Sequence, residues 1–263
     1  MSASTPSEGP TTGLAYDPEP GAARPSAAGF LIDALRRRPA GRRVLSGLTT
    51  VLFIGGMGLF AYPFFTDIYT TQIVQSRLED QFETITVDSV DEWEAQVSGQ
   101  QGAALTRIAI PALGLDTLVV EGTSAAALRA GAGHYPNTPL PGQEGNVAIA
   151  GHRTTYGRPF NQLDELQIGD EIWLSTPVGD FRYVAVASPT DGECRATATA
   201  ACVTTPRDWS VIAPTSEAVL TLTTCHPKGS AAERLVVRAQ LVDTHPQGTY
   251  TQLRDQGEVA ALR

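Results

Sequence analysis

The chain contains little cysteine and little basic charge for its length. Its 263 residues include three cysteines, and 19 basic side chains stand against 28 acidic ones. So few cysteines exclude a small domain held together by disulfides, because such domains use cysteine densely. The formal charge of −9 argues against nucleic acid as the main partner, since binding phosphates needs a basic surface. The length allows one or two domains with a substantial core.

Charged residues are absent from one long stretch, residues 44–66. As a helix that rises about 1.5 Å per residue, these 23 residues would cover roughly 34 Å, enough to cross a bilayer core of about 30 Å. Asp67 follows the stretch, and arginines precede it. Since positive residues stay on the cytoplasmic side, the sequence predicts one membrane span with the N-terminus in the cytoplasm and the remaining chain outside. The arginines are Arg36, Arg37, Arg38, Arg42 and Arg43.

Two other interpretations of the apolar stretch are weaker. A cleaved signal peptide would have a shorter apolar region and a shorter leader than these 43 residues. A buried core helix is rarely so long, so unpatterned and so closely preceded by arginines. The charge distribution agrees with a membrane boundary, because residues 1–66 carry a charge of +2 and residues 67–263 carry −11.

The segments on either side of the span differ in composition. Residues 1–43 are rich in small and polar residues and end in arginines, which predicts a disordered cytoplasmic tail. Within residues 67–103, apolar residues recur every four positions at Val74, Leu78 and Phe82. This spacing predicts a short helix that forms a stalk or docks on the next domain. From residue 84 the pattern fades into a linker-like stretch that ends in SGQQG.

Residues 104–243 read as a β domain, and residues 244–263 follow as a C-terminal tail. Short runs rich in β-branched residues alternate with turns such as PALG and HPKGS. Helix is suggested by TSAAALRAG and, more weakly, by FNQLDELQ. Seven such runs within about 140 residues predict a mainly β fold, a closed barrel or a sandwich with little helix. The runs are LTRIAI, DTLVV, NVAIAG, DEIWLST, DFRYVAVAS, AVLTLTT and RLVVRAQLV.

The three cysteines lie in two different contexts. Cys194 and Cys202 are close together in a polar loop, and outside the membrane they can pair in a disulfide. Cys225 ends an apolar strand and is left over, so it is either an inert buried thiol or a reactive one. A zinc site is not expected, because the loop cysteines lack CxxC spacing and have no histidine nearby. No acidic cluster suggests a calcium site, and no metal is predicted.

Two other strand-end residues could make Cys225 reactive. A cysteine nucleophile needs a base or cation nearby and a group that stabilises the oxyanion formed when it attacks a carbonyl. His152 follows the strand NVAIAG, and Arg234 begins the strand RLVV. Arginine is permanently protonated, so Arg234 could orient substrate or stabilise negative charge but not act as a base. A turn histidine and a solvated edge arginine remain the alternative interpretations.

These residues lie in segments that resemble a known family. NVAIAGHRTTYGRPF, TLTTCHP and ERLVVRAQL are similar to the three signature blocks of sortases, the membrane-anchored cysteine transpeptidases of Gram-positive bacteria. TLTTC matches the family pattern TLxTC, and RIAIPALGLDTLVVEGT resembles the opening strands. The resemblance covers about residues 104–243. It implies an eight-stranded sortase β-barrel with short helices behind one N-terminal transmembrane helix.

The resemblance also implies roles for individual residues. Cys225 would be the nucleophile, His152 the general acid and base, and Arg234 the cation that stabilises the oxyanion or positions substrate. Arg238 is a rival for the last role, because it faces the same side of its strand as Arg234. The family places its arginine at the start of this strand, which favours Arg234. The residues expected to bind substrate are Tyr135, Thr223 and Thr224.

A sortase of this kind implies a reaction and partners. The thiolate of Cys225 would cleave the Thr–Gly bond of a C-terminal sorting signal, hold the substrate as a thioester and release it to an amine. The expected partners are exported proteins that carry sorting signals and an amine of a peptidoglycan precursor or a pilin. No cofactor and no nucleic acid are expected. The catalytic domain would lie outside the cell, tethered by its single span.

The details of the motifs resemble class E, the housekeeping sortases of actinobacteria. GAGHYPNTPLPG before the histidine strand and HP after TLTTC are typical of that class, which tends to read LAxTG rather than LPxTG signals. Tyr135 aligns with the tyrosine implicated in that choice. A pilin-polymerising class C or D enzyme is the alternative, although residues 67–103 lack an Asp-Pro-aromatic lid motif and nothing after Val242 could span a membrane again.

Two further functions compete with transpeptidation. A cysteine hydrolase would release the same peptides to water, and a catalytically silent exported binding module would leave Cys225 unreactive. The loop that carries Cys194 and Cys202 departs from the general family pattern, because it lies where sortases keep their substrate-specificity loop. A disulfide there would stiffen that loop.

Overall fold

A computed structural model describes Gly29 and residues 39–188 and 193–259. The chain divides into two compact units, Met1–Leu59 and Phe60–Arg263. In the first unit, the described structure is helical and belongs to helix α2, Pro39–Ile68. The predicted tail, residues 1–43, lies mostly outside the described residues.

Helix α2 has the composition of a membrane span. Within the described residues, one helix is long and apolar enough to cross a bilayer, and α2 forms its first part. Large apolar side chains along α2 are exposed, as Leu59 and Phe60 show with 78% and 75% of their surface accessible. Such an apolar surface is costly in water and favourable in lipid, so its length and character fit a single span.

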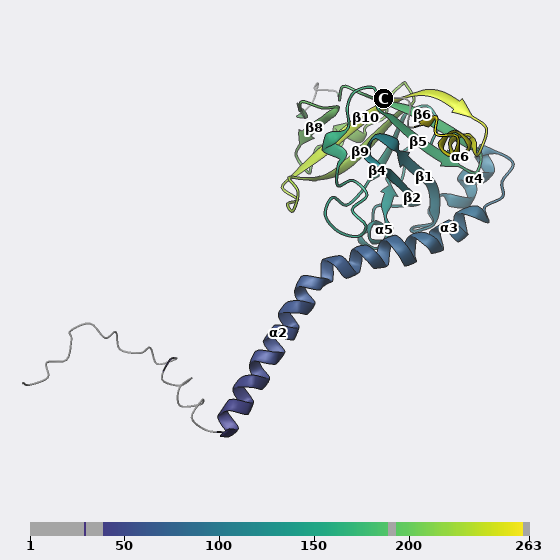
Figure 1. Cartoon of the computed structure of the whole chain (residues 1–263). Coiled ribbons are helices and arrows are strands. Elements are labelled where there is room, and N and C mark those ends of the chain that lie inside the picture. The colour runs from purple at the N-terminus through teal and green to yellow at the C-terminus, as the bar shows by residue number, and fades with distance from the viewer. Residues whose placement is uncertain (1–28, 30–38, 189–192, 260–263) are drawn as a thin grey trace, which may run out of the picture. The chain divides into compact units, whose positions relative to one another are not determined.

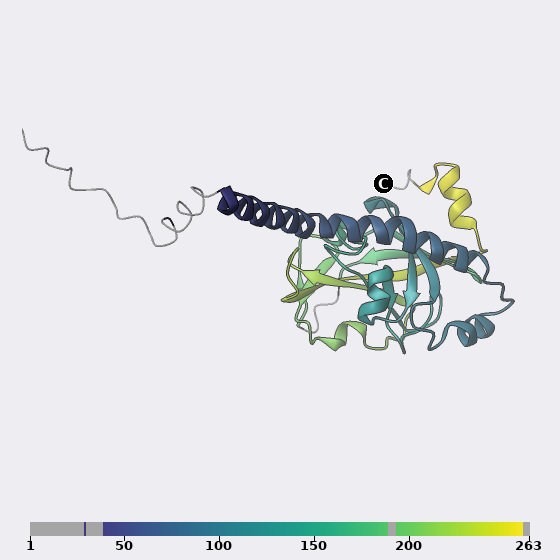
Figure 2. The ribbon, with the colours of Figure 1, turned by 90° about the horizontal axis from the view of Figure 1, so that it is seen from below.

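A docked helix follows the apolar stretch. One π-helical segment, Tyr69–Val74, leads into helix α3, Gln75–Glu83, which lies along one side of the barrel (Figure 2). Leu78 is buried against Leu118 and Val120, as the four-residue spacing predicted. The Gln75 carboxamide accepts from the Leu118 backbone N–H at 2.8 Å and donates to the Ala130 carbonyl at 2.7 Å. The helix is therefore packed on the β domain within the second unit.

The β domain is a closed barrel of eight strands in mixed orientation (Figure 1). The ring order is β6-β5-β1-β2-β3-β4-β9-β10, and β10 closes it by pairing with β6. The β2–β3 and β4–β9 pairs are parallel and the others antiparallel. Closure leaves the ring without an open edge. The strands are β1 Ala104–Ile110, β2 Leu115–Glu121, β3 Ala132–His134, β4 Asn146–Ala150, β5 Glu171–Thr176, β6 Gly179–Val186, β9 Val219–His226 and β10 Glu233–His245.

Two short strands extend the sheet outside the ring. Strand β8, Ala201–Thr204, pairs with the first half of β10, and β7, Arg195–Ala196, pairs with β8. The remaining elements are short helices that join or cover the strands. They are 3₁₀ turns at Pro111–Leu113, Leu163–Glu165 and Trp209–Ile212, helix α4 Val90–Val97, helix α5 Ala125–Ala130 and helix α6 Thr249–Asp255.

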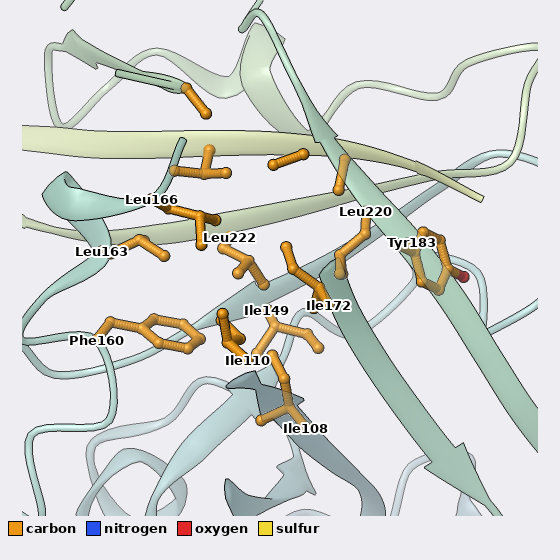
Figure 3. Packing of buried hydrophobic residues seen from close by; sticks show 14 of the residues in the cluster. Ile108, Ile110, Ile149, Phe160, Leu163, Leu166, Ile172, Tyr183, Leu220 and Leu222 are labelled. Atoms are coloured by element: carbon orange, nitrogen blue, oxygen red, sulfur yellow. The ribbon is translucent and has the colours of Figure 1, made fainter. Parts of the chain in front are cut away.

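The barrel interior is filled by strand side chains and by one loop (Figure 3). Ile108, Ile149 and Leu222 point inward from β1, β4 and β9. Phe160 and Leu163, from the loop after β4, insert among them and are 1% and 0% exposed. Each such side chain contributes about 1.5–3 kcal/mol by leaving water. This burial anchors the loop that begins at His152.

The fold differs from the sequence prediction in several short elements. The seven predicted strands and the helix in TSAAALRAG are present, but FNQLDELQ forms only the turn Leu163–Glu165. Strands β3 and β8 were not predicted, because they are too short to show alternation. The tail expected at residues 244–263 instead contains the end of β10 and helix α6, whose Tyr250 ring lies 5.5 Å from that of Trp173.

The expected linker after residue 84 contains a further helix, which corrects that prediction for residues 90–97. Ser89 caps α4 by accepting from the Glu92 N–H at 3.2 Å, and the Glu92 carboxylate accepts from the Asp88 N–H at 3.0 Å. Ser89 and Glu92 form the S-x-x-E signature that marks a helix start, although the carboxylate reaches the N–H of the residue before the cap. Trp93 is fully buried against Leu105 and Leu140.

The burial of Trp93 generates a stability prediction. Trp93→Ala should lower the free energy of unfolding of the full chain in detergent by about 3–5 kcal/mol, because the vacated volume cannot refill. Trp209 is 67% exposed, so Trp209→Ala serves as the control and should change stability by less than about 0.5 kcal/mol. Denaturant unfolding of both variants is the measurement. Equal stability would mean that α4 does not belong to the folded unit.

Candidate functional site

Strand register gathers Cys225, His152 and Arg234 at one end of the barrel. In the antiparallel β9–β10 pair, Arg234 lies directly opposite Cys225. In the parallel β4–β9 pair, Ala150 is level with Thr223, and the Gly151 N–H still donates to the Thr223 carbonyl at 3.0 Å. Cys225 and Arg234 therefore stand in one row, and His152 follows β4 at the same end of the barrel, on the other side of β9 from Arg234.

The side chain of Cys225 faces away from the barrel core. Leu220 and Leu222 point inward in the same strand, so alternation turns Thr223 and Cys225 to the outer face. Cys225 is a free thiol and is half-buried, so a substrate can approach it. Thr224 points the other way, is buried, and donates its hydroxyl hydrogen to the Gly151 carbonyl at 2.8 Å.

The surroundings of His152 favour its neutral form. Burial lowers the pKa of His152 from its usual value, and the positive charge of Arg129 lowers it further. The imidazole ring lies 5.2 Å from the Tyr156 ring, and the Arg129 guanidinium lies 5.9 Å from the centre of that same tyrosine ring. At neutral pH His152 is therefore ready to accept a proton.

The two candidate arginines occupy different positions on β10. Arg234 faces Cys225, and its guanidinium donates to the backbone carbonyls of Ala231 at 3.1 Å and Glu233 at 3.0 Å. Arg238 faces Thr221, four residues along the strand from the Arg234–Cys225 pair, and donates to the Val211 carbonyl at 2.8 Å. Register favours Arg234 as the cation nearest the reacting carbonyl.

The residues expected to bind substrate divide between the two faces of β9. Tyr135 reaches across from the segment after β3, and its hydroxyl lies 3.0 Å from the Thr223 hydroxyl. Thr223 and Cys225 share the outer face, so Tyr135 and Thr223 can line the approach to the thiol. Thr224 differs from the expectation, because its buried side chain braces the end of β4 just before His152.

The loop cysteines are joined in a disulfide, as their spacing suggested. Cys194 and Cys202 have Cα atoms 5.5 Å apart, and the bridge packs on Val236 and Val211. Cys202 lies opposite Val236 in the β8–β10 pair, two positions along from the row that contains Arg234. The disulfide therefore covers the outer face of β10 beside the site.

A surface hollow lies next to this part of β8. Its volume is about 730 Å³, and it is lined by the segment that follows Thr204, the residue opposite Arg234. Trp209 stands at its rim with 67% of its surface exposed. Within the described residues, no cluster of three or more histidine, cysteine or acidic side chains could hold a metal ion.

Sequence reasoning missed Arg153. This arginine is 3% exposed, and its guanidinium contacts the backbone carbonyl of Cys225 at 3.2 Å. Its position directly after His152 was the one signal in the sequence. The partner carbonyl lies 72 residues away, so no local pattern could reveal the contact.

Comparisons with known proteins agree with this geometry. A family model described as "Sortase domain" matches residues 108–242. Sortase D of Bacillus subtilis is 29% identical over 153 residues, which cover 57% of this chain and 69% of that protein. Sortase SrtE2 of Streptomyces coelicolor is 29% identical over 227 residues, covering 80% and 87%. Sortase SrtE1 of the same organism is 30% identical over 57% of this chain and 44% of its own length.

Among solved structures, a Sortase D5 transpeptidase of Clostridium perfringens superposes with a TM-score of 0.54 at 29% identity. The superposition covers 65% of this chain and 99% of that one. The family match spans the strands that carry the histidine, the cysteine and the arginine. The similarity to SrtE1 and SrtE2 agrees with the class E resemblance of the motifs. The chain belongs to the sortase family of cysteine transpeptidases.

Proposed function

We propose that the protein is a membrane-anchored sortase that cleaves a C-terminal sorting signal between Thr and Gly and transfers the exported protein to a cell-wall amine. The observation that supports the proposal is the direct pairing of Cys225 with Arg234 on β9 and β10, with His152 just beyond the end of the neighbouring strand β4. A nucleophile, a proton carrier and a permanent cation at one end of the barrel are the parts that acyl transfer requires.

The proposed chemistry has two halves. The active enzyme is the minor population with a Cys225 thiolate and a His152 imidazolium. The thiolate attacks the threonine carbonyl, the oxyanion forms beside Arg234, and His152 gives its proton to the departing glycine amine. An incoming amine then attacks the thioester, its proton passes to His152, and the Cys225 thiolate leaves. Each step conserves protons, so no cofactor is needed.

Tyr135 and Thr223 support a class E preference for LAxTG over LPxTG. Their hydroxyls meet on the outer face of β9, two residues before the nucleophile, where the signal residues that precede the Thr–Gly bond would lie. A side chain at the second signal position would contact this pair. A pilin-polymerising class C or D reaction remains the alternative, and acceptor identity separates the two.

The proposed anchor is the apolar part of helix α2. Its exposed apolar side chains and the five arginines that precede them support a span with the N-terminus in the cytoplasm. The acidic catalytic unit then lies outside, at the cell wall. Tethering keeps the enzyme at the surface where exported substrates emerge.

The first test concerns the nucleophile. The full chain in detergent, given an LAxTG peptide and an amine, should yield a joined product by mass spectrometry, and Cys225→Ala should yield none. Thr221→Ala alters the same strand without removing a reacting group and should retain product formation. Joined product from Cys225→Ala would rule out the thioester. Cleavage without joining, even with excess amine, would identify a hydrolase.

The second test separates the two arginines of β10. Arg234→Met should lower kcat/KM by about 10²- to 10³-fold, because the oxyanion loses its charged partner. Arg238→Met should lower kcat/KM by less than about 10-fold, since its position opposite Thr221 is further from the reacting carbonyl. Steady-state kinetics on both variants decide the assignment. The reverse order of effects would move the cation role to Arg238.

The third test uses the electrostatics of His152. Burial and Arg129 both lower the pKa of His152, so the neutral imidazole persists to lower pH than usual. Arg129→Met removes one of these causes and should raise that pKa, which moves the acidic limb of the kcat/KM profile to higher pH. Arg254→Met is the control, because it removes an arginine whose ion pair with Asp116 lies at the surface. An unchanged acidic limb in Arg129→Met would show that the limb does not report His152.

A further inference from the structure

A buried cation lies directly behind the nucleophile. Arg153 is 3% exposed, although a charged side chain is normally costly to bury. One end of its guanidinium, Nη2, lies 2.8 Å from the Asp164 carboxylate. The other, Nη1, donates to the Cys225 carbonyl at 3.2 Å and approaches Nδ1 of His226 at 2.8 Å. Arg153 thus contacts both the nucleophile's backbone and the residue after it.

The contact with His226 fixes the state of that imidazole. Arginine carries donors and no acceptor, so Nδ1 of His226 must accept the hydrogen bond. The contact therefore requires the arrangement in which Nδ1 of His226 carries no hydrogen. The end of β9 is therefore held through two successive residues by one planar donor group, which a compact ammonium could not reproduce.

The loop that carries Arg153 is held as firmly as the strand. The Arg153 carbonyl accepts from the Asn161 side chain at 2.7 Å, and the His152 carbonyl accepts from the Phe160 N–H at 3.2 Å. Phe160 is itself buried in the barrel core. Any shift of the guanidinium would therefore move the backbone on which His152 sits, together with that of Cys225.

We propose that Arg153 is a positioning residue of the sortase reaction: its guanidinium sets the distance and angle between the Cys225 thiol and the His152 imidazole by tying their two backbones together. Asp164 orients the guanidinium and balances its charge. The inference rests on the proposed transpeptidase function. A misplacement of about 1 Å between reacting groups can lower the rate on the order of 10²-fold. A contact that fixes the distance between the two backbones therefore affects the rate of the reaction.

Several charged or titratable groups lie around Cys225 and can affect the pH dependence of its reactions. His152 belongs to the loop after β4, and Arg153 lies next to it. Arg234 and Glu233 face β9 from β10, with Glu233 opposite His226. Asp164 lies behind Arg153, and the Lys228 ammonium is 3.8 Å from its other carboxylate oxygen. Arg129 acts from α5 on His152.

The test compares Arg153→Lys and Arg153→Met with Arg182→Met in the full chain in detergent. Arg182 is the control, because it is likewise an ion-paired arginine, here bound to Glu171 and Asp243, and its ion pairs involve neither β9 nor the loop after β4. Two readouts are measured. They are kcat and KM for joining an LAxTG peptide to an amine, and the pH profile of Cys225 alkylation by iodoacetamide, which needs no peptide substrate.

Arg153→Met should lower kcat by about 10- to 100-fold and leave KM within about 3-fold of the wild-type value. The reason is that the Cys225 thiol and the His152 imidazole lose their alignment, while the residues that bind the peptide are unchanged. Its alkylation profile should move to higher pH, because a cation near the thiolate is lost. Arg153→Lys keeps the charge but cannot bridge three acceptors. It should keep the alkylation profile while kcat still falls. Arg182→Met should leave both readouts unchanged.

Two results would overturn the proposal. One is a kcat and an alkylation profile of Arg153→Met equal to those of Arg182→Met. The other is a wild-type kcat in Arg153→Lys, which decides the matter even when Arg153→Met does not fold. If the wild-type chain joins no peptide at all, the proposed function fails, while the alkylation profiles of the same variants still report on Arg153.

Discussion

The hydrogen-bonded pairing of β4, β9 and β10 is the constraint on which the site depends. It is parallel on one side of β9 and antiparallel on the other, and it sets which residues stand level at the strand ends. A slip of one residue in either pair would turn Cys225 to the core or move it past Arg234. Because β10 also pairs with β6, closure of the barrel fixes this register from the far side. The site is thus a property of the whole ring.

The loop after β4 connects the barrel core to the candidate site. Phe160 and Leu163 insert into the barrel, and the same loop begins with His152 and Arg153. Its position is therefore held by apolar burial at one end and by hydrogen bonds to β9 at the other. Loops generally move more than the elements they join. Here His152 is tied through its loop to the buried barrel core and to β9, which suits its proposed role as an aligned proton carrier.

The sequence predicted what depends on local pattern and missed what depends on distant contacts. The long apolar run, the seven strands and the cysteine pairing could be read because each leaves a periodic or compositional signal. Helix α4 left a capping signature at Ser89 that the polar composition around it obscured. Apart from its place directly after His152, Arg153 left no signal, because the sequence does not distinguish a buried arginine from a solvated one, and the carbonyl it contacts is 72 residues away. His152, Cys225 and Arg234 could be recognised together from the three sequence motifs. Their arrangement in space depends on how β9 pairs with β4 and β10, which the motifs do not show.

Strand β10 joins the closed ring to the short hairpin that lies outside it. Its residues from Arg238 onward close the barrel against β6, while Arg234–Val237 support β8 on the same edge. The disulfide between Cys194 and Cys202 packs on Val236, within that first half. The hairpin lies outside the ring of hydrogen-bonded strands, but Ala201 and Val203 of β8 are buried in the barrel core. The wall beside Cys225 and Arg234 is therefore held both by strand pairing with β10 and by the same apolar core that supports β9.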